Sequence, residues 1–281
     1  MHKFFKYCLR QPSCFIGLFI VFMVICSAVL APVISPMDPN GMSLVERLIP
    51  SLESSSRGMH ILGTDSLGRD VLSRIIYGAR ISLMVGLISA FISIMIGVTL
   101  GLISGYFGGV VDAVIMRFAD IQLAFPFILL ALTVMATIGG GTEPLIFVLG
   151  IGHWMTYARV VRGEVLSLKN TEFVEAARAS GLKNVKIIIK HILPNIVAPT
   201  IVLISFNVAS NILNEASLSF LGIGVDVGTP SWGSLMAEGR EYISTAWWVT
   251  TYSGLATMLT VLGINLLGDG VRDYLDPKLK K

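Results

Sequence analysis

The sequence has few charged residues for its length. Only 14% of its 281 residues are Asp, Glu, Lys or Arg, whereas soluble domains carry about 25%. This scarcity excludes an ordinary soluble protein. It also leaves five long intervals without a single charged residue, which are 11–37, 81–111, 121–142, 191–214 and 242–268. Each interval can hold the roughly 20 apolar residues that cross a bilayer as a helix.

A sixth apolar run, residues 144–158, is shorter than the other five. Arg159 and Arg162 follow it, and long basic side chains at a helix end reach back to the membrane surface and so extend the span. Hydrophobic residues make up 54% of the chain. The sequence therefore predicts an all-α membrane protein with about six transmembrane helices.

The chain also lacks the residue patterns of common catalytic and cofactor sites. It has no Gly-x-x-x-x-Gly-Lys-Ser/Thr loop for nucleotide phosphates and no dinucleotide fingerprint. Its four histidines are too scattered for a metal site. We therefore expect no catalysis, cofactor or metal in this chain. The small net charge of +3 gives no reason to expect nucleic acid as a partner.

Cysteine is scarce as well. Cys8, Cys14 and Cys26 are the three cysteines, and they lie in or beside the first apolar run without metal-ligand spacing. Their odd number and their position near lipid argue against a disulfide framework.

Lys and Arg are unevenly distributed between the two sides of the membrane. Short loops rich in these residues stay in the cytoplasm. If the N-terminus is inside, 15 of the 21 basic residues lie in the inner segments, which are 1–13, 106–120, 159–194 and 269–281. The opposite orientation would export the seven basic residues of 159–194. We therefore predict that both ends of the chain are cytoplasmic, N-in and C-in.

Breaks in the pattern divide the chain into three parts. Residues 1–35 hold a cytoplasmic flank and the first membrane helix. Residues 36–78 form an extracytoplasmic segment that opens with a cluster of Pro, Asp, Asn and Gly. Residues 79–281 form a core with five further membrane helices and a long inner loop at 163–194. The short inner segment 106–120 is expected to be a turn, in which Arg117 and Asp120 are spaced to pair.

Two polar or small-residue stripes stand out within the apolar runs. The first has a small residue at every fourth position, namely Ser89, Ser93, Gly97, Gly101 and Gly105. Such a stripe lets another backbone approach closely, either within one bundle or at a subunit interface. The second consists of Asn207, Asn211, Asn214 and Glu215. It suits a water-filled solute path and, equally, hydrogen bonds between neighbouring helices. His153, in the shorter run, is more typical of a histidine satisfied within a bundle than of a ligand.

The inner loop has the most specific pattern in the chain. Residues 171–180 read as an Ala-rich helix with charges on its outer face, and Gly181 ends it. Residues 182–192 restart a basic amphipathic helix, which Pro194 is expected to stop where the next membrane helix begins. The first helix has the form of a segment that docks in a groove of another protein, although a solvated connector is the plain alternative.

These residues resemble a known family. Glu175-Ala176-Ala177, followed by Gly181 and by Leu193-Pro194, resembles the EAA loop of permease subunits of bacterial ABC importers. Four further stretches are similar to the second permease of dipeptide, oligopeptide and nickel importers, and they are 62–70, 157–163, 218–224 with 229–233, and 267–277. Where the general pattern has an aliphatic residue, this chain has His191. The resulting sequence His-Ile-Leu-Pro-Asn resembles the same branch of the family.

The resemblance implies an ABC importer type I permease fold in the bacterial cytoplasmic (inner) membrane. The implied partners are a second homologous permease in a heterodimer, two cytoplasmic ATPase subunits that use ATP and Mg, an extracytoplasmic solute-binding protein, and membrane lipid. The implied solutes are small peptides or nickel and metal chelates. The ATPase-coupling residues that it implies are Glu172, Glu175, Ala176, Ala177, Gly181, Leu193 and Pro194. The second polar stripe keeps open an ATP-independent secondary transporter or channel, and a structural membrane anchor is the third alternative.

Overall fold

The structure is a computed structural model of the chain and describes residues 2–275. In that part, five helical stretches are long and apolar enough to cross a membrane, which are Pro12–Val29, Val71–Phe107, Thr142–Leu168, Asn184–Phe220 and Trp247–Leu275. A further pair, Gly109–Leu123 and Phe127–Ile138, is bent by 88° and counts as a sixth span if it crosses as one broken helix. The prediction of an all-α fold with about six spans is confirmed.

The helices follow one another with few other elements between them. Their bounds in chain order are α1 His2–Cys8, α2 Pro12–Val29, α3 Ala31–Ile34, α4 Val71–Phe107, α5 Gly109–Leu123, α6 Phe127–Ile138, α7 Thr142–Gly152, α8 Trp154–Leu168, α9 Glu172–Ala179, α10 Asn184–Ile187, α11 Leu193–Phe220, α12 Trp232–Gly239 and α13 Trp247–Leu275. Short 3-10 turns occupy Leu44–Glu46 and Arg240–Tyr242. The strands β1 Glu53–Ser55 and β2 Gly58–His60 form an antiparallel hairpin.

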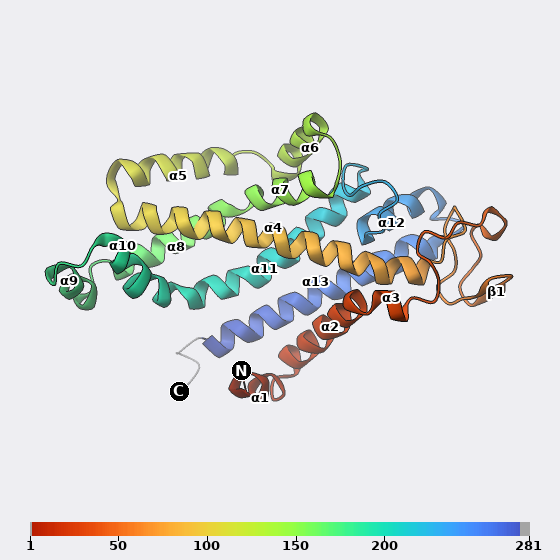
Figure 1. Cartoon of the computed structure of the whole chain (residues 1–281), viewed down its shortest axis with the longest axis horizontal. Coiled ribbons are helices and arrows are strands. Elements are labelled where there is room, and N and C mark those ends of the chain that lie inside the picture. The colour runs from red at the N-terminus through yellow and green to blue at the C-terminus, as the bar shows by residue number, and fades with distance from the viewer. Residues whose placement is uncertain (1, 276–281) are drawn as a thin grey trace.

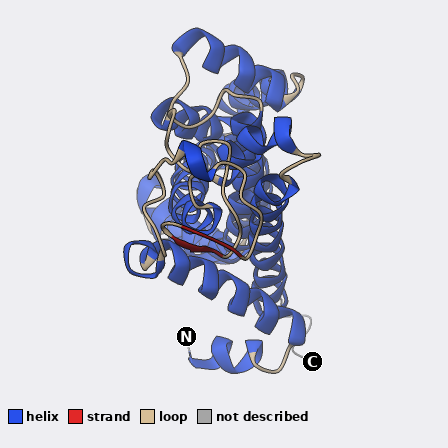
Figure 2. Cartoon of the chain, turned by 90° about the vertical axis from the view of Figure 1, so that its right-hand side faces the viewer, coloured by secondary structure: helices blue, strands red, loops and turns tan. Residues whose placement is uncertain are grey.

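The long helices α2, α4, α8, α11 and α13 run along the long axis of the molecule, with α4 in the middle (Figure 1). The N-terminus, α9 and the end of α13 lie at one end of the bundle, which we call the inner end. The hairpin and α12 lie at the opposite, outer end, where loops cover the ends of the helices (Figures 1 and 2). The described ends of the chain, α1 and the end of α13, therefore lie on the side of α9, as the predicted N-in, C-in topology requires. Residues 276–281, which include Lys278, Lys280, Lys281 and the end of the 267–277 stretch, lie outside the described residues.

The small-residue stripe of α4 packs against α7 and α8 of the same chain. The Ser93 hydroxyl donates to the Gly150 carbonyl at 2.7 Å. A Cβ added at Gly101 would lie 2.7 Å from the Ala158 carbonyl oxygen and 2.8 Å from Val161 Cβ. All five residues of the stripe are buried. In this chain the stripe thus serves helix packing within the bundle.

We expect Gly101→Leu to destabilise the fold by about 1–3 kcal/mol, because the new side chain must push α8 away from α4. Gly163→Leu is the matched control, since Gly163 lies on α8 and a Cβ there meets nothing within 4 Å. Thermal unfolding in detergent measures both variants. Equal melting temperatures for the two would contradict this packing.

The extracytoplasmic segment forms a compact polar layer at the outer end. Ser56 Oγ donates to the Glu46 carboxylate at 2.7 Å, and Arg57 also contacts it. These hydrogen bonds, with that of Ser56 the largest cause, lower the pKa of Glu46 to about 2. Asp70 caps α4 by accepting from the backbone N–H of Ser73 at 2.8 Å.

Three sequence predictions about the inner end need correction. Residues 106–120 are not a turn, because α5 begins directly after Gly108, whose φ of +66° reverses the chain. Asp120 pairs with Arg159 on α8 and not with Arg117. Finally, α8 continues as a helix to Leu168, so the inner loop begins later than the sequence suggested.

The prediction that Pro194 stops a helix is wrong. The helical stretch runs from Asn184 to Phe220, and residues 188–192 within it form a π-helical turn. The Leu193 N–H donates to the Ile188 carbonyl, five residues back. This wider turn accommodates a proline, which lacks an N–H and would clash with an ordinary α-helical carbonyl.

The cysteine prediction is wrong for one pair. The chain breaks between α1 and α2, which brings the Cα atoms of Cys8 and Cys14 to 5.0 Å, and the two form a disulfide. Both residues are fully buried. Cys26 is a free thiol.

Candidate functional site

Helix α9 is amphipathic, and its apolar face is buried in the inner end of the bundle. Val174 and Ala177 pack with Val161 and Val165 of α8 in one apolar cluster. The opposite face is exposed and carries Glu172, Phe173, Glu175, Ala176 and Arg178. A face that combines acidic side chains with an exposed phenylalanine ring is suited to contact another protein.

Gly181 turns the chain between α9 and α10. Its φ is +78°, a region that disfavours other residues, and a Cβ there would meet nothing within 4 Å. The Leu182 N–H donates to the Ala177 carbonyl at 3.3 Å across the turn. Glycine is therefore required by the backbone conformation and not by lack of space. The two predicted helices on either side of Gly181 are present.

Several polar contacts fix this helical pair to the inner ends of the long helices. The Tyr106 hydroxyl of α4 donates to Asn184 Oδ1 at 2.9 Å. The Arg178 guanidinium lies 6.0 Å from the centre of the Tyr106 ring. Lys169 Nζ donates to the Gly105 carbonyl at 3.3 Å. Two of these contacts join the α9–α10 pair to α4, and the third joins the end of α8 to α4.

We name the exposed part of α9, α10 and the following π-helical turn the coupling surface, after the role that the sequence predicts for it. It consists of Glu172, Phe173, Glu175, Ala176, Val185 and Ile189. Phe173, Val185 and Ile189 are exposed by 44%, 64% and 55%. Of the predicted coupling residues, Leu193 is half-buried against the same apolar cluster, whereas Pro194 is exposed at the start of α11.

The predicted polar stripe on α11 divides into two parts. Glu215 is fully buried and accepts from Ser82 of α4 and from Ser219, each at 2.8 Å. Asn211 is also fully buried and lies beside Asn207, to which it donates at 3.4 Å. Asn214 instead lines an open cavity. Adjacent helical residues point about 100° apart, so Asn214 and Glu215 face different surroundings.

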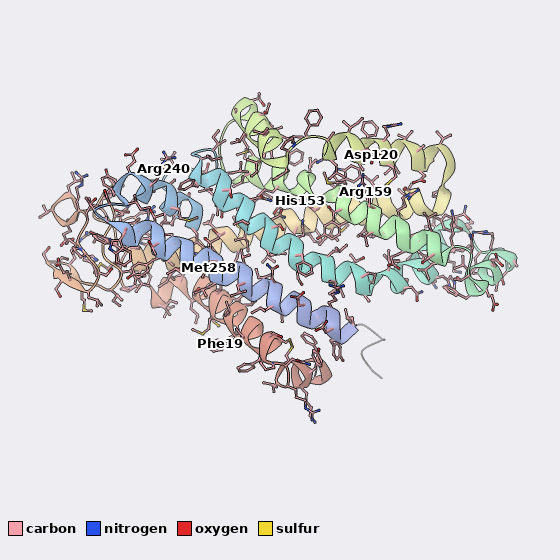
Figure 3. All side chains as sticks on the ribbon, turned by 180° about the vertical axis from the view of Figure 1, so that it is seen from behind. Phe19, Asp120, His153, Arg159, Arg240 and Met258 are labelled. Carbon is pink, nitrogen blue, oxygen red and sulfur yellow. A yellow bond between two sulfur atoms is a disulfide. The ribbon has the colours of Figure 1, made fainter. Side chains whose placement is uncertain are left out.

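Helix α5 is attached to α8 by ion pairs that the sequence did not reveal. Arg162 Nη2 donates to Asp112 Oδ2 at 2.6 Å, and Arg159 Nη2 donates to Asp120 Oδ1 at 2.5 Å. Figure 3 shows Asp120 and Arg159 side by side on the two helices. Near the end of α5, Gln122 accepts from the Trp154 indole at 2.7 Å. The partners are 32 to 50 residues apart in sequence, beyond the reach of any local pattern.

Residues 2–275 contain no cluster of three or more His, Cys, Asp and Glu side chains that could hold a metal ion. His153, the histidine nearest the middle of the bundle, lies with its Nδ1 3.4 Å from the Leu149 carbonyl oxygen. Its ring is tilted against the Phe127 ring, and the two ring centres lie 4.8 Å apart.

Comparisons with known proteins agree with this architecture. Residues 97–281 match the family described as binding-protein-dependent transport system inner membrane component. The chain is 42% identical over 273 residues to a putative peptide transport system permease protein of Brucella suis biovar 1 (strain 1330), covering 97% of this chain and 90% of the relative. It is 41% identical over 277 residues to the dipeptide transport system permease protein DppC of Alkalihalophilus pseudofirmus, covering 98% and 89%.

A third relative is the glutathione transport system permease protein GsiD of Escherichia coli O6:K15:H31, which is 41% identical over 281 residues and covers 99% of this chain and 91% of the relative. Among solved structures, an inward-facing conformation of the MetNI methionine ABC transporter matches with a TM-score of 0.59 at 20% identity, covering 73% of this chain and 97% of that one. This structural likeness supports the type I permease fold. The chain belongs to the family of binding-protein-dependent transport inner membrane components, as a multi-pass permease subunit of an ABC importer in the bacterial inner membrane.

Proposed function

We propose that this subunit forms half of a pathway for small peptides, paired with a second homologous permease. Two cytoplasmic ATPase subunits hydrolyse ATP with Mg, and an extracytoplasmic binding protein delivers the solute. The relatives named for peptide, dipeptide and glutathione transport support peptides as the solute class. Nickel or another metal chelate is the less supported solute, because residues 2–275 offer no multi-ligand cage for a divalent ion.

The observation that carries the proposal is the exposed coupling surface on helices α9 and α10, which pack against the inner ends of α4 and α8. Phe173, Val185 and Ile189 offer apolar contacts to a partner, and Glu172 and Glu175 offer charge. A groove on an ATPase subunit accommodates such a helix in the helix-in-groove mode of recognition. When the ATPase pair closes on ATP, the attached α8 and α4 move with α9 and the bundle rocks between inward-facing and outward-facing states.

An ATP-independent carrier or channel is the second candidate function. The polar stripe on α11 is the observation that favours it. Asn211 and Glu215 are fully buried within the subunit, so they supply no ion path along its surface. The stripe therefore gives this alternative little support.

The test uses the whole complex with its ATPases and binding protein in proteoliposomes. We expect Glu175→Lys to reduce peptide uptake about tenfold, because the reversed charge weakens the contact with the ATPase subunit and a loss of about 1.4 kcal/mol corresponds to tenfold in binding. We expect a similar loss for Gly181→Pro, because proline cannot adopt the positive φ of this turn. The ATPases should still hydrolyse ATP in both variants. Radiolabelled dipeptide uptake and phosphate release are measured together.

Two controls match these changes. Glu53→Lys makes the same charge change on the exposed hairpin at the outer end. Gly181→Asn keeps a residue that tolerates positive φ. Both controls should transport normally. Normal uptake by Glu175→Lys and Gly181→Pro would overturn the coupling role, and uptake without ATP would favour the carrier or channel.

A further inference from the structure

An open cavity of about 410 Å³ lies between the start of α6, the break between α7 and α8, and the apolar length of α11. It lies along the membrane-spanning part of the bundle and away from the coupling surface. The residues that line it and concern us here are Pro126, Phe127, His153, Ser210, Leu213 and Asn214. Its volume lies within the range of sites that hold small molecules, about 300–1,000 Å³.

Two helix breaks meet at this cavity. The chain bends by 88° between α5 and α6, and Pro126 precedes the first residue of α6. His153 separates α7 from α8 (Figure 3). Such irregular backbone is tolerated at membrane depth only where it is buried in protein or lines a water-filled space. Since the cavity is open in this subunit, a partner subunit covers it or water fills it in the assembled complex.

The polar side chains at the cavity point to the same conclusion. Ser210 is exposed, and Asn214 and His153 are half-buried. A hydroxyl, an amide and an imidazole facing lipid would be costly, so this wall faces protein or water in the assembled complex. Leu213 and the Phe127 ring supply the apolar remainder of the wall.

We infer that this cavity is a contact site for the peptide backbone of the transported solute, an inference that rests on the proposed function. Asn214 and Ser210 offer hydrogen-bond donors and acceptors that match a peptide N–H and C=O. No charged side chain lines the cavity. The cavity therefore recognises the peptide bond of the solute and not the charge of its side chains. This suits a subunit that transports peptides of varied sequence.

The first test asks whether the cavity faces water, without any transport assay. Ser210→Cys and Asn214→Cys are made in a Cys26→Ser background, and the complex in proteoliposomes is treated with a membrane-impermeant thiosulfonate reagent. Ser253→Cys is the control, because Ser253 is fully buried and its hydroxyl donates to the Val249 carbonyl of its own helix. We expect labelling at 210 and 214 to be at least tenfold faster than at 253. Equal rates at all three positions would overturn the inference.

The second test asks whether the cavity contacts the peptide bond. We expect Asn214→Leu to slow uptake of a dipeptide about tenfold while ATP hydrolysis stimulated by the loaded binding protein persists. The loss should be much smaller for the matching depsipeptide, whose ester lacks the N–H. Ser217→Ala is the control on the same helix, since the Ser217 hydroxyl bonds to the Leu213 carbonyl and lies outside this cavity.

The outcomes separate the inference from the function on which it rests. Normal dipeptide uptake by Asn214→Leu, or an equal loss for ester and amide, overturns the backbone contact while the proposed function stands. A wild-type complex that takes up no peptide overturns the proposed solute class and the backbone contact together.

Discussion

Replacing Arg74 by alanine is expected to destabilise the protein by about 3–5 kcal/mol, as removing one partner from a buried ion pair does. Arg74 is fully buried at the outer end of α4. Its guanidinium donates to Asp65 Oδ2 at 2.6 Å and to Glu238 Oε1 at 3.0 Å. Arg69 contacts the same two carboxylates, so two positive charges balance two negative ones. Without Arg74, Arg69 alone faces both carboxylates, and the group carries one unbalanced negative charge.

The loss is measured as the change in unfolding free energy in detergent. Arg80→Ala is the control, because Arg80 lies on the same helix and is exposed. Its effect should stay within about 0.5 kcal/mol. Arg74→Lys should fall between the two, since it keeps the charge but cannot contact both carboxylates with one planar group. If Arg74→Ala were as stable as Arg80→Ala, the polar group would not hold the outer end together.

The membrane spans were predictable from sequence where hydrocarbon excludes charge. The charge-free run 81–111 became the apolar length of α4, and the run 242–268 became that of α13. The same criterion failed for α5, which contains Asp112, Arg117 and Asp120. Because two of these charges pair with arginines on α8, a helix forms where the absence of a long apolar run suggested a turn.

The candidate site shows the same division between local and distant causes. The helices on either side of Gly181 were predictable, because capping and turn conformation depend on neighbouring residues. The cavity was not predictable, since it requires a bend before Phe127 and a break at His153 to meet α11 in space. The sequence presents the polar stripe as one unit. In the structure, the rotation of the helix turns Asn214 toward the cavity and Glu215 toward α4.

The position of helix α5 depends on its contacts with α8. Ala119 is its one buried residue, while apolar side chains such as Val110 and Phe118 are exposed by 79% and 64%. Apolar contacts between α5 and α8 are confined to the side of α5 that carries Ala119. The ion pairs of Asp112 and Asp120 add to this attachment to α8, the helix that leads directly into α9.

We expect Arg162→Asp to reduce peptide uptake roughly 30-fold, because opposed carboxylates in place of an ion pair change the energy by about 2 kcal/mol or more at this partly exposed site. Movement of α9 and α8 would then no longer reach α5. The ATPases should still hydrolyse ATP, so uptake per ATP hydrolysed is the quantity to measure. Arg117→Asp is the control, since Arg117 is exposed on the same α5 and is not paired with Asp120.

The double variant Asp112→Arg with Arg162→Asp separates coupling from simple misfolding. It restores an ion pair of opposite polarity between the same two positions, so uptake per ATP should recover to within a few-fold of the wild type. Ser104, whose hydroxyl donates to Asp112 at 2.5 Å, can accept from the new arginine. If the double variant were as impaired as Arg162→Asp, the attraction between α5 and α8 would not be what carries motion from α8 to α5. Recovery would show that the sign of each charge matters less than the pairing of the two helices.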